Sequence, residues 1–198
     1  MFEFPRPERL YKAYIFDCDG TLAHSMPLHL DAWNYGLKTA GAPFQLKGEN
    51  FLQVAGMSMS QTIVHWNEEH QLAMKPETVI EAKMDYFHNN LDDIVGLEPV
   101  IEFARECLAK GAALSVASGG SRPDVIDTLR RIGVLELFPV VVTADDVARA
   151  KPHPDLFLKA AEEMGIEPAD CLVIEDSPLG VEGAKRAGMD AVLIPSLI

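Results

Sequence analysis

The chain has few cysteines, a shortage of cations and no long apolar run, and each shortage excludes a class of protein. Its three cysteines, Cys18, Cys107 and Cys171, lie far apart in apolar stretches. They indicate reduced, buried thiols in a cytoplasmic protein, and neither a disulfide framework nor a zinc site. Lysine and arginine number 17 against 30 acidic residues, a formal net charge of −13, which argues against nucleic acid or an anionic membrane as a partner. No apolar run approaches membrane-spanning length, and the first ten residues read as a lead-in without a signal sequence.

Apolar residues are abundant instead, and their pattern indicates the fold class. They make up 48% of the 198 residues, enough for one domain or for one domain with an insertion. From Gly96 on, helical segments alternate with short apolar runs at residues 113–117, 140–143, 171–174 and 191–194, and a similar run covers residues 13–16. Strands this uniformly apolar are covered on both faces, as in parallel sheets with crossover helices. We therefore predict an α/β fold with a doubly wound, Rossmann-like parallel sheet.

The stretch between the first strand and the alternating part has helical periodicity only. Ser25 and Pro27 are suited to cap and begin a helix that ends at Gly41. Further helices are expected over residues 58–70 and from residue 76, the latter with an apolar stripe at Ile80, Met84, Phe87 and Leu91. The nearby Lys83 is expected to face solvent. We predict a helical cap domain at residues 26–94, inserted into a core domain of residues 12–25 and 95–198, with hinges near residues 22–26 and 94–97.

Residues suited to catalysis follow four separate predicted strands. In chain order they are Asp17 and Asp19, Ser118 and Gly119, Lys151, and Glu175 and Asp176. Ligands of open parallel sheets bind beyond the carboxyl ends of the strands. We therefore expect these side chains to meet at one edge of the sheet.

The carboxylates among them suit a hard metal ion. Asp17 and Asp19 are close in sequence, and paired carboxylates stay ionised at close range only if a cation joins them. Asp17, Asp176 and Glu175 offer the oxygen ligands that Mg²⁺ prefers, with Asp19 as a further candidate. The sequence therefore predicts Mg²⁺ as the cofactor.

With that metal, the set suits the hydrolysis of a phosphate monoester. Asp17 is the predicted nucleophile, which forms an aspartyl-phosphate. Asp19 is suited to protonate the leaving oxygen if its pKa lies nearer neutrality than that of Asp17. Lys151 and Ser118 are expected to bind phosphoryl oxygens. A receiver-like phosphoacceptor module uses the same residue types, but the acid pair after the first strand and the long helical insertion argue against it.

The motifs resemble those of a known family. In order, they are Asp17-Cys18-Asp19-Gly20-Thr21, Ser118, Lys151-Pro152 and Glu175-Asp176-Ser177. As a set they are similar to the motifs of haloacid dehalogenase superfamily phosphohydrolases, in the β-phosphoglucomutase-like and fructose-1-phosphatase-like branch with a helical cap. The dehalogenases of the superfamily lack an acid at the position of Asp19, so the resemblance implies phosphoryl transfer.

Two activities of this branch stay open. Its mutases hold a second phosphate with basic residues of the cap, but the equivalent loop here has Ala55 where a lysine is expected. No lysine or arginine occurs between Lys47 and Lys75. We therefore favour a phosphatase for a small phosphate ester, a sugar phosphate first, with β-phosphoglucomutase as the alternative. A monomer or small homo-oligomer is expected.

The resemblance also suggests residues that bind the substrate. They are Thr21, His29, Gly56, Gly119 and Arg122. His29 is either a substrate or proton-transfer residue or a solvated histidine on a helix. Arg122 either meets the substrate or is a solvated arginine before a helix.

Overall fold

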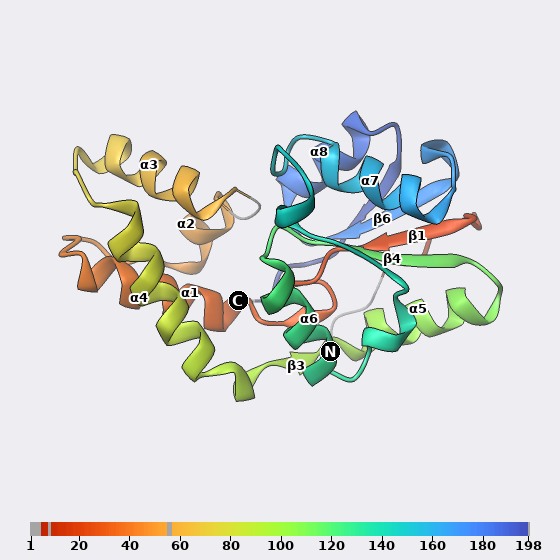
Figure 1. Ribbon diagram of the computed structural model, residues 1–198, viewed down its shortest axis with the longest axis horizontal. Coiled ribbons are helices and arrows are strands. Elements are labelled where there is room, and N and C mark those ends of the chain that lie inside the picture. Colours follow the sequence, from red (N-terminus) through yellow and green to blue (C-terminus); the bar gives the residue numbers. More distant parts are fainter. Residues whose placement is uncertain (1–4, 8, 55–56, 198) are drawn as a thin grey trace.

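The protein contains a five-stranded parallel sheet covered by helices on both faces (Figure 1). The computed structural model describes residues 5–7, 9–54 and 57–197. The strands are β1 (Ala13–Phe16), β4 (Ala113–Ala117), β5 (Val140–Val142), β6 (Cys171–Glu175) and β7 (Asp190–Leu193). Their order is β5-β4-β1-β6-β7, and all neighbours pair in parallel. This confirms the predicted doubly wound fold.

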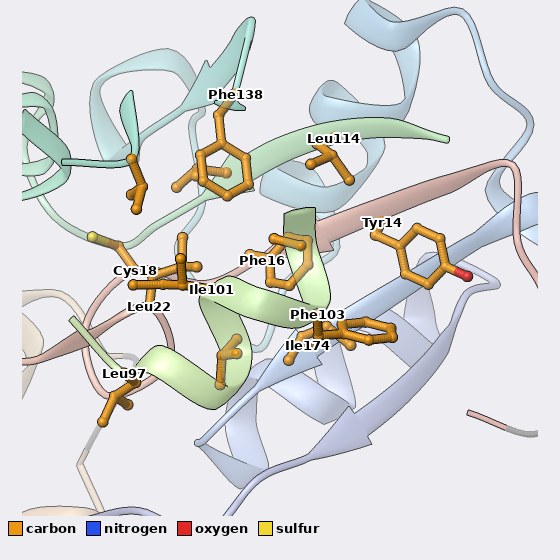
Figure 2. Packing of buried hydrophobic residues seen from close by; sticks show 14 of the residues in the cluster. Tyr14, Phe16, Cys18, Leu22, Leu97, Ile101, Phe103, Leu114, Phe138 and Ile174 are labelled. Carbon is orange, nitrogen blue, oxygen red and sulfur yellow. The ribbon is translucent and has the colours of Figure 1, made fainter. Parts of the chain in front are cut away.

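The two faces of the sheet carry separate hydrophobic clusters. Helices α5 (Glu98–Ala109) and α6 (Arg122–Arg131) cover one face, and α7 (Asp155–Met164) and α8 (Pro178–Arg186) cover the other (Figure 1). In β1, Tyr14 and Phe16 point to the first face, whereas Ala13 and Ile15 point to the second, as the alternation of side chains along a strand requires. Figure 2 shows the ring of Phe16 between the helix and strand residues of the first cluster.

Four helices form a second body beside the sheet (Figure 1). They are α1 (Met26–Thr39), α2 (Gly48–Leu52), α3 (Met59–His70) and α4 (Pro76–Asn89), and the sequence pattern predicts all but the short α2. They enclose a hydrophobic cluster of their own, in which Trp33 and Trp66 meet edge to face at 5.0 Å. The domain boundaries at residues 26 and 94 stay a prediction, which this separate cluster supports.

The chain passes twice between the two bodies, and the two passages lie side by side. Strand β2 (Ala23–His24) pairs antiparallel with β3 (Val95–Gly96), and the Leu97 amide donates a 2.8 Å hydrogen bond to the Leu22 carbonyl. These residues lie in the segments predicted as hinges. The pairing holds the two linkers side by side through backbone hydrogen bonds.

Short 3₁₀ helices complete the described structure at Leu91–Asp93, Leu135–Leu137, Ala144–Asp146 and Pro168–Asp170. None of the helices that the structure describes has the length and apolar character needed to cross a membrane.

A glycine sets the distance between α1 and α4. A Cβ atom on Gly36 would lie 2.6 Å from the carbonyl oxygen of Val79 and 3.1 Å from the Cβ of Lys83. The first contact is closer than real Cβ atoms come and the second is tighter than most, so this close approach of the helices depends on the missing side chain of residue 36. The same approach fixes where α4 presents its inner face.

We expect Gly36→Ala to destabilise the protein, because the added methyl group would push α4 away from α1. The free energy of unfolding should fall by roughly 1–3 kcal/mol, as for other overpacked sites, although glycine-to-alanine changes inside helices usually stabilise by up to about 1 kcal/mol. Denaturant unfolding measures the effect. The matched control is Lys38→Ala on the exposed side of α1, which should change stability by less than about 0.5 kcal/mol. A gain in stability for Gly36→Ala would contradict the close approach.

Candidate active site

One cavity of about 160 Å³ lies where the strand ends meet the helical body. Its core side is lined by side chains that follow β1, β4, β5 and β6, among them Asp17, Asp19, Ser118, Gly119, Lys151 and Asp176. The structure therefore brings together residues that are up to 159 positions apart in the sequence. The carboxyl edge of the sheet is where ligands of open α/β folds bind.

Lys151 forms the central ion pair of this site. Its Nζ donates a 2.6 Å hydrogen bond to Asp17 Oδ1 and a short one to Glu175 Oε1. All three residues are buried. Burial alone would lower the pKa of Lys151, but the Asp17 and Glu175 carboxylates raise it above its usual value. Lys151 is therefore a permanent cation at this position.

Glu175 is held on both of its oxygens. Oε1 accepts from Lys151, and Oε2 accepts from the Ser177 amide and from the Ser177 hydroxyl, each at 2.9 Å. Helix α8 passes close above it, since a Cβ on Gly180 would lie 1.9 Å from Glu175 Oε1. Glu175 is thus a fixed anchor for Lys151.

A metal ion has one group of candidate ligands in the described part of the chain. Asp17, Glu175 and Asp176 each place a carboxylate oxygen within 4.8 Å of the others, and all three are buried. Burial and the neighbouring carboxylates raise the pKa of Asp17 well above its usual value, with Lys151 opposing. Burial, followed by Glu175, raises the pKa of Asp176 to about 7. Three buried carboxylates against one lysine leave a negative excess that suits a divalent cation with oxygen ligands.

Asp19 stands apart from that group and faces the cap. Its Oδ1 accepts a 2.7 Å hydrogen bond from the Ser25 hydroxyl and lies 3.1 Å from His29 Nε2. Burial would raise the pKa of Asp19, but His29 and Ser25 lower it to about 2. Relative to Asp17, this order of pKa values is the reverse of the one expected for a general acid. Ser25 also makes no capping hydrogen bond to α1, contrary to expectation, because its hydroxyl is committed to Asp19.

The loop after β4 forms the opposite wall of the cavity. Ser118 is buried, and its Oγ accepts a 3.1 Å hydrogen bond from the Gly120 amide. A Cβ on Gly120 would lie 3.5 Å from Ser118 Oγ and 3.9 Å from Asp19 Oδ2, so this loop runs directly beside Asp19. Gly119 also lines the cavity, and its Cβ position faces open space.

Several suggested substrate residues have other placements. Arg122 donates to Asp146 at 2.6 Å and to the Val141 carbonyl at 3.0 Å, and it does not line the cavity. Thr21 is buried outside the cavity, with no hydrogen-bond partner for its hydroxyl among the described residues. Gly56 lies outside the described residues. His29, by contrast, lines the cavity and stacks on Phe87 with ring centres 4.5 Å apart.

Lys83 of α4 is a cavity residue, and the expectation that it faces solvent is wrong. It is 4% exposed, and its Nζ lies 3.4 Å from Met84 Sδ and 4.8 Å from the centre of the Phe87 ring. A sequence signal did exist, because Val79, Lys83 and Phe87 recur every four residues and form the buried stripe of the helix.

Apolar side chains make up most of the rest of the cap wall. They include Met26, Trp33, Phe51, Met59, Met84 and Phe87. They come from all four cap helices, so the cavity lies between the helical body and the core.

Comparisons with known proteins show the family of the chain. A model described as haloacid dehalogenase-like hydrolase matches residues 14–194. Over 188 residues the chain is 32% identical to Fructose-1-phosphate phosphatase YqaB of Escherichia coli, covering 92% of this chain and 95% of the relative. Over 188 residues it is 29% identical to Validoxylamine A 7'-phosphate phosphatase of Streptomyces hygroscopicus subsp. limoneus, covering 92% and 85%.

Solved structures are similar over nearly the whole chain. The structure of CbbY from Rhodobacter sphaeroides in complex with phosphate has a TM-score of 0.80 at 27% identity, covering 95% of this chain and 88% of that chain. A β-phosphoglucomutase from Clostridium difficile has a TM-score of 0.78 at 22% identity, covering 93% and 84%, and shares the fold. These matches confirm the resemblance seen in the motifs.

We expect Lys83→Met to stabilise the protein, because methionine removes a buried charge and keeps the apolar stem. Burial lowers the pKa of Lys83 to about 8, although Asp19 and Asp124 oppose this. A shift of this size corresponds to about 3 kcal/mol of added unfolding free energy in the variant at pH 7.

The pH dependence separates this effect from general packing. The folded-state pKa lies below the ordinary 10.5, so the unfolded chain binds more protons between these values and the wild type gains stability as the pH rises. The stability difference between the variant and the wild type should be largest below pH 8 and shrink toward pH 10.5, as measured by thermal unfolding. Lys47→Met, at an exposed cap lysine, should show no such trend. An advantage that stays constant with pH would contradict a buried charge.

Proposed function

Since the chain belongs to the haloacid dehalogenase-like hydrolase family, we propose that it hydrolyses a small phosphate monoester through an aspartyl-phosphate on Asp17, with Mg²⁺ as cofactor. The observation that carries this proposal is the convergence of four side chains on one cavity. Asp17 is bound to Lys151, and Asp19 and Ser118 stand opposite. The names of the relatives, which are phosphatases of small phosphate esters, support the same activity.

In the first step, a carboxylate oxygen of Asp17 attacks phosphorus, and the bond from phosphorus to the leaving oxygen breaks. Lys151 holds Asp17 Oδ1, which leaves Oδ2 to approach the phosphoryl group. The departing oxygen takes a proton from the pair formed by Asp19 and His29, whose atoms lie 3.1 Å apart. The alcohol then leaves, and the phosphoryl group stays on Asp17.

In the second step, water attacks the phosphorus atom, and the bond to Asp17 breaks. The pair of Asp19 and His29 takes the proton of the water, which restores its first state. Lys151 and the Ser118 loop bind the phosphoryl oxygens throughout. When bound by Asp17, Glu175 and Asp176, a Mg²⁺ ion supplies the positive charge that lets a carboxylate approach a phosphate dianion.

Hydrolysis is favoured over isomerisation by the charges of the cap. A mutase has to hold a second phosphate. In the described residues, Lys83 is the single lysine or arginine that the cap contributes to the cavity. β-Phosphoglucomutase activity stays the second candidate, because Lys83 alone could still contact a second phosphate. β-Glucose 1-phosphate with a trace of its bisphosphate separates the two, since the phosphatase releases inorganic phosphate and the mutase yields glucose 6-phosphate.

The finer identity of the ester is part of the same proposal. The name of the Escherichia coli relative makes sugar phosphates the first group to test, as the sequence also suggests. Cytoplasmic location and a monomeric or small homo-oligomeric state stay predictions.

Asp17→Asn should abolish turnover, because an amide cannot form the aspartyl-phosphate. Release of inorganic phosphate from a panel of small esters with Mg²⁺ should fall by at least about 10³-fold. Chelation of Mg²⁺ should silence the wild type, and added Mg²⁺ should restore it. Circular dichroism and thermal unfolding should show an intact fold, since the change is nearly isosteric. Asp31→Asn, at an exposed residue of α1, is the control. Near-normal turnover by Asp17→Asn would refute the nucleophile.

Asp19→Ala should lower kcat/KM by about 10²–10⁴-fold for an alkyl phosphate, the usual range when a proton-transfer group is lost, because it breaks the pair of Asp19 and His29 that supplies the proton. The loss should be much smaller for p-nitrophenyl phosphate, whose leaving group departs without a proton. A merely structural role would lower both rates equally. An equal loss for the two esters would therefore contradict the assignment of Asp19 to proton transfer.

A further inference from the structure

Helix α6 of the core presents a polar stripe to the active-site cavity. Ser121, Asp124 and Thr128 recur at helical spacing, and all three line the cavity. Val125 and Leu129 of the same helix pack into the hydrophobic core. Polar side chains of a surface helix normally face water, but these three face the space where a substrate binds. The reaction steps proposed above use none of them.

Asp124 is held in place by the core and by the cap. Its Oδ2 accepts a 2.5 Å hydrogen bond from the Ser121 hydroxyl, and its Oδ1 lies 2.7 Å from Nε2 of His88 on the cap helix α4. Each oxygen of a carboxylate can accept two hydrogen bonds. Asp124 is therefore a fixed acceptor, and each of its oxygens has a lone pair left for a ligand.

Thr128 and Lys83 are buried polar residues that lack a strong partner. They are 2% and 4% exposed, and both line the cavity. No described residue forms a hydrogen bond with the Thr128 hydroxyl, and the hydrogen bond of the Lys83 ammonium group goes to Met84 Sδ at 3.4 Å. Buried polar groups are normally hydrogen-bonded, so these two groups indicate a ligand that carries donors and acceptors.

The charges around the polar stripe favour a neutral ligand. Burial lowers the pKa of Lys83, and the carboxylates of Asp19 and Asp124 oppose this effect. The one lysine that the cap contributes, among the described cavity residues, therefore already faces two negative charges. Asp124 would repel a carboxylate or a second phosphate on the leaving group, whereas a hydroxyl can donate to Asp124 and accept from Lys83.

The polar stripe begins next to the place of the leaving oxygen. A Cβ on Gly120 would lie 3.9 Å from Asp19 Oδ2 and 3.0 Å from Val125 Cγ2, so Gly120 lies beside both Asp19 and the start of α6. A leaving group that takes its proton from the pair of Asp19 and His29 therefore lies near the first turns of α6.

We propose, on the basis of the phosphatase function above, that Asp124 and Thr128 determine specificity: they select a neutral leaving group that bears hydroxyls and exclude one that carries a second negative charge. Asp124 accepts a hydrogen bond from one hydroxyl, and Thr128 and Lys83 pair with others. The substrates are then phosphate esters of polyols and sugars, and they do not include bisphosphates or phosphorylated acids.

Three esters of one three-carbon chain test this selectivity. Glycerol 3-phosphate carries free hydroxyls, 3-phosphoglycerate has a carboxylate in place of the terminal hydroxymethyl group, and n-propyl phosphate has no hydroxyl. With Mg²⁺, kcat/KM of the wild type should be at least about tenfold higher for glycerol 3-phosphate than for either of the others, because a like charge or an unpaired buried polar group opposes binding. This comparison needs no variant.

Asp124→Asn tests the charge, since it keeps the shape of the side chain. The ratio of kcat/KM for glycerol 3-phosphate over 3-phosphoglycerate should fall at least about fivefold, because the carboxylate of the second ester is no longer repelled. Asp127→Asn is the matched control on the same helix. Its side chain is 39% exposed and lies outside the cavity, so the ratio should stay that of the wild type.

Thr128→Val tests the hydroxyl partner. The ratio of kcat/KM for glycerol 3-phosphate over n-propyl phosphate should fall severalfold, because the variant lacks one group that pairs with a substrate hydroxyl. Ser121 and Asp124 also fit an ordinary helix cap. A cap alone would change stability and lower the rates for all three esters together, so the ratios separate it from a role in specificity.

p-Nitrophenyl phosphate distinguishes the two levels of failure. If the wild type does not hydrolyse this activated ester with Mg²⁺, the phosphatase function fails and the selectivity falls with it. If it does, equal kcat/KM for glycerol 3-phosphate and 3-phosphoglycerate overturns the selectivity and leaves the phosphatase intact. The role of Asp124 is overturned as well if Asp124→Asn and Asp127→Asn both keep the wild-type ratio. For esters that turn over slowly, inhibition constants against p-nitrophenyl phosphate supply the same ratios.

Discussion

The ion pair of Lys151 with Asp17 and Glu175 is the interaction on which the site depends. In the sheet, Phe16 pairs with Ile174, so the next residues of β1 and β6 are adjacent acids. The carboxylates of Asp17 and Glu175 are buried close together and repel each other. Lys151, from the loop after β5, offsets this repulsion by pairing with both. Loss of one partner would leave an uncompensated buried charge, which costs several kcal/mol, about 3–5 in typical cases. The ion pairs of Lys151 with Asp17 and Glu175 therefore bind the three strand ends to one another at the edge where the cavity lies.

Parallel topology explains why the sequence predicts this part of the molecule well. Each strand is a short apolar run, and its carboxyl end is fixed by the next polar residue, so the residues after β1, β4 and β6 reach one edge without further information. Arg122 was less predictable, since its position depends on a partner, Asp146, that no periodicity encodes. Ser25 is a similar case. It has the right residue type for a helix cap, but its hydroxyl binds Asp19 instead.

The sequence does not decide which face of helix α4 is buried, and the position of Lys83 depends on that choice. Helix α4 has two overlapping apolar stripes, and the expected one contains Ile80 and Met84, whereas the buried one contains Val79 and Lys83. Gly36 decides between them, because its missing side chain admits the backbone of Val79 and the stem of Lys83. A lysine stem is long and apolar enough to pack in such a place. Lys83, which the sequence pattern predicts to be exposed to solvent, therefore faces the cavity.

The core and the cap contribute opposite physical properties to one cavity. The core contributes fixed charges that are expensive to bury, and the cap contributes a mostly apolar wall beside them. An apolar wall lowers the local dielectric constant, so the attraction between Lys151 and the Asp17 and Glu175 carboxylates is stronger there than in water. The cap is joined to the core by the paired strands β2 and β3, and its helices also contact the core directly, where His29 Nε2 lies 3.1 Å from Asp19 Oδ1 and His88 Nε2 lies 2.7 Å from Asp124 Oδ1. The cap wall and the core charges are therefore parts of one site, and a change at His29 alters the surroundings of Asp19 as well.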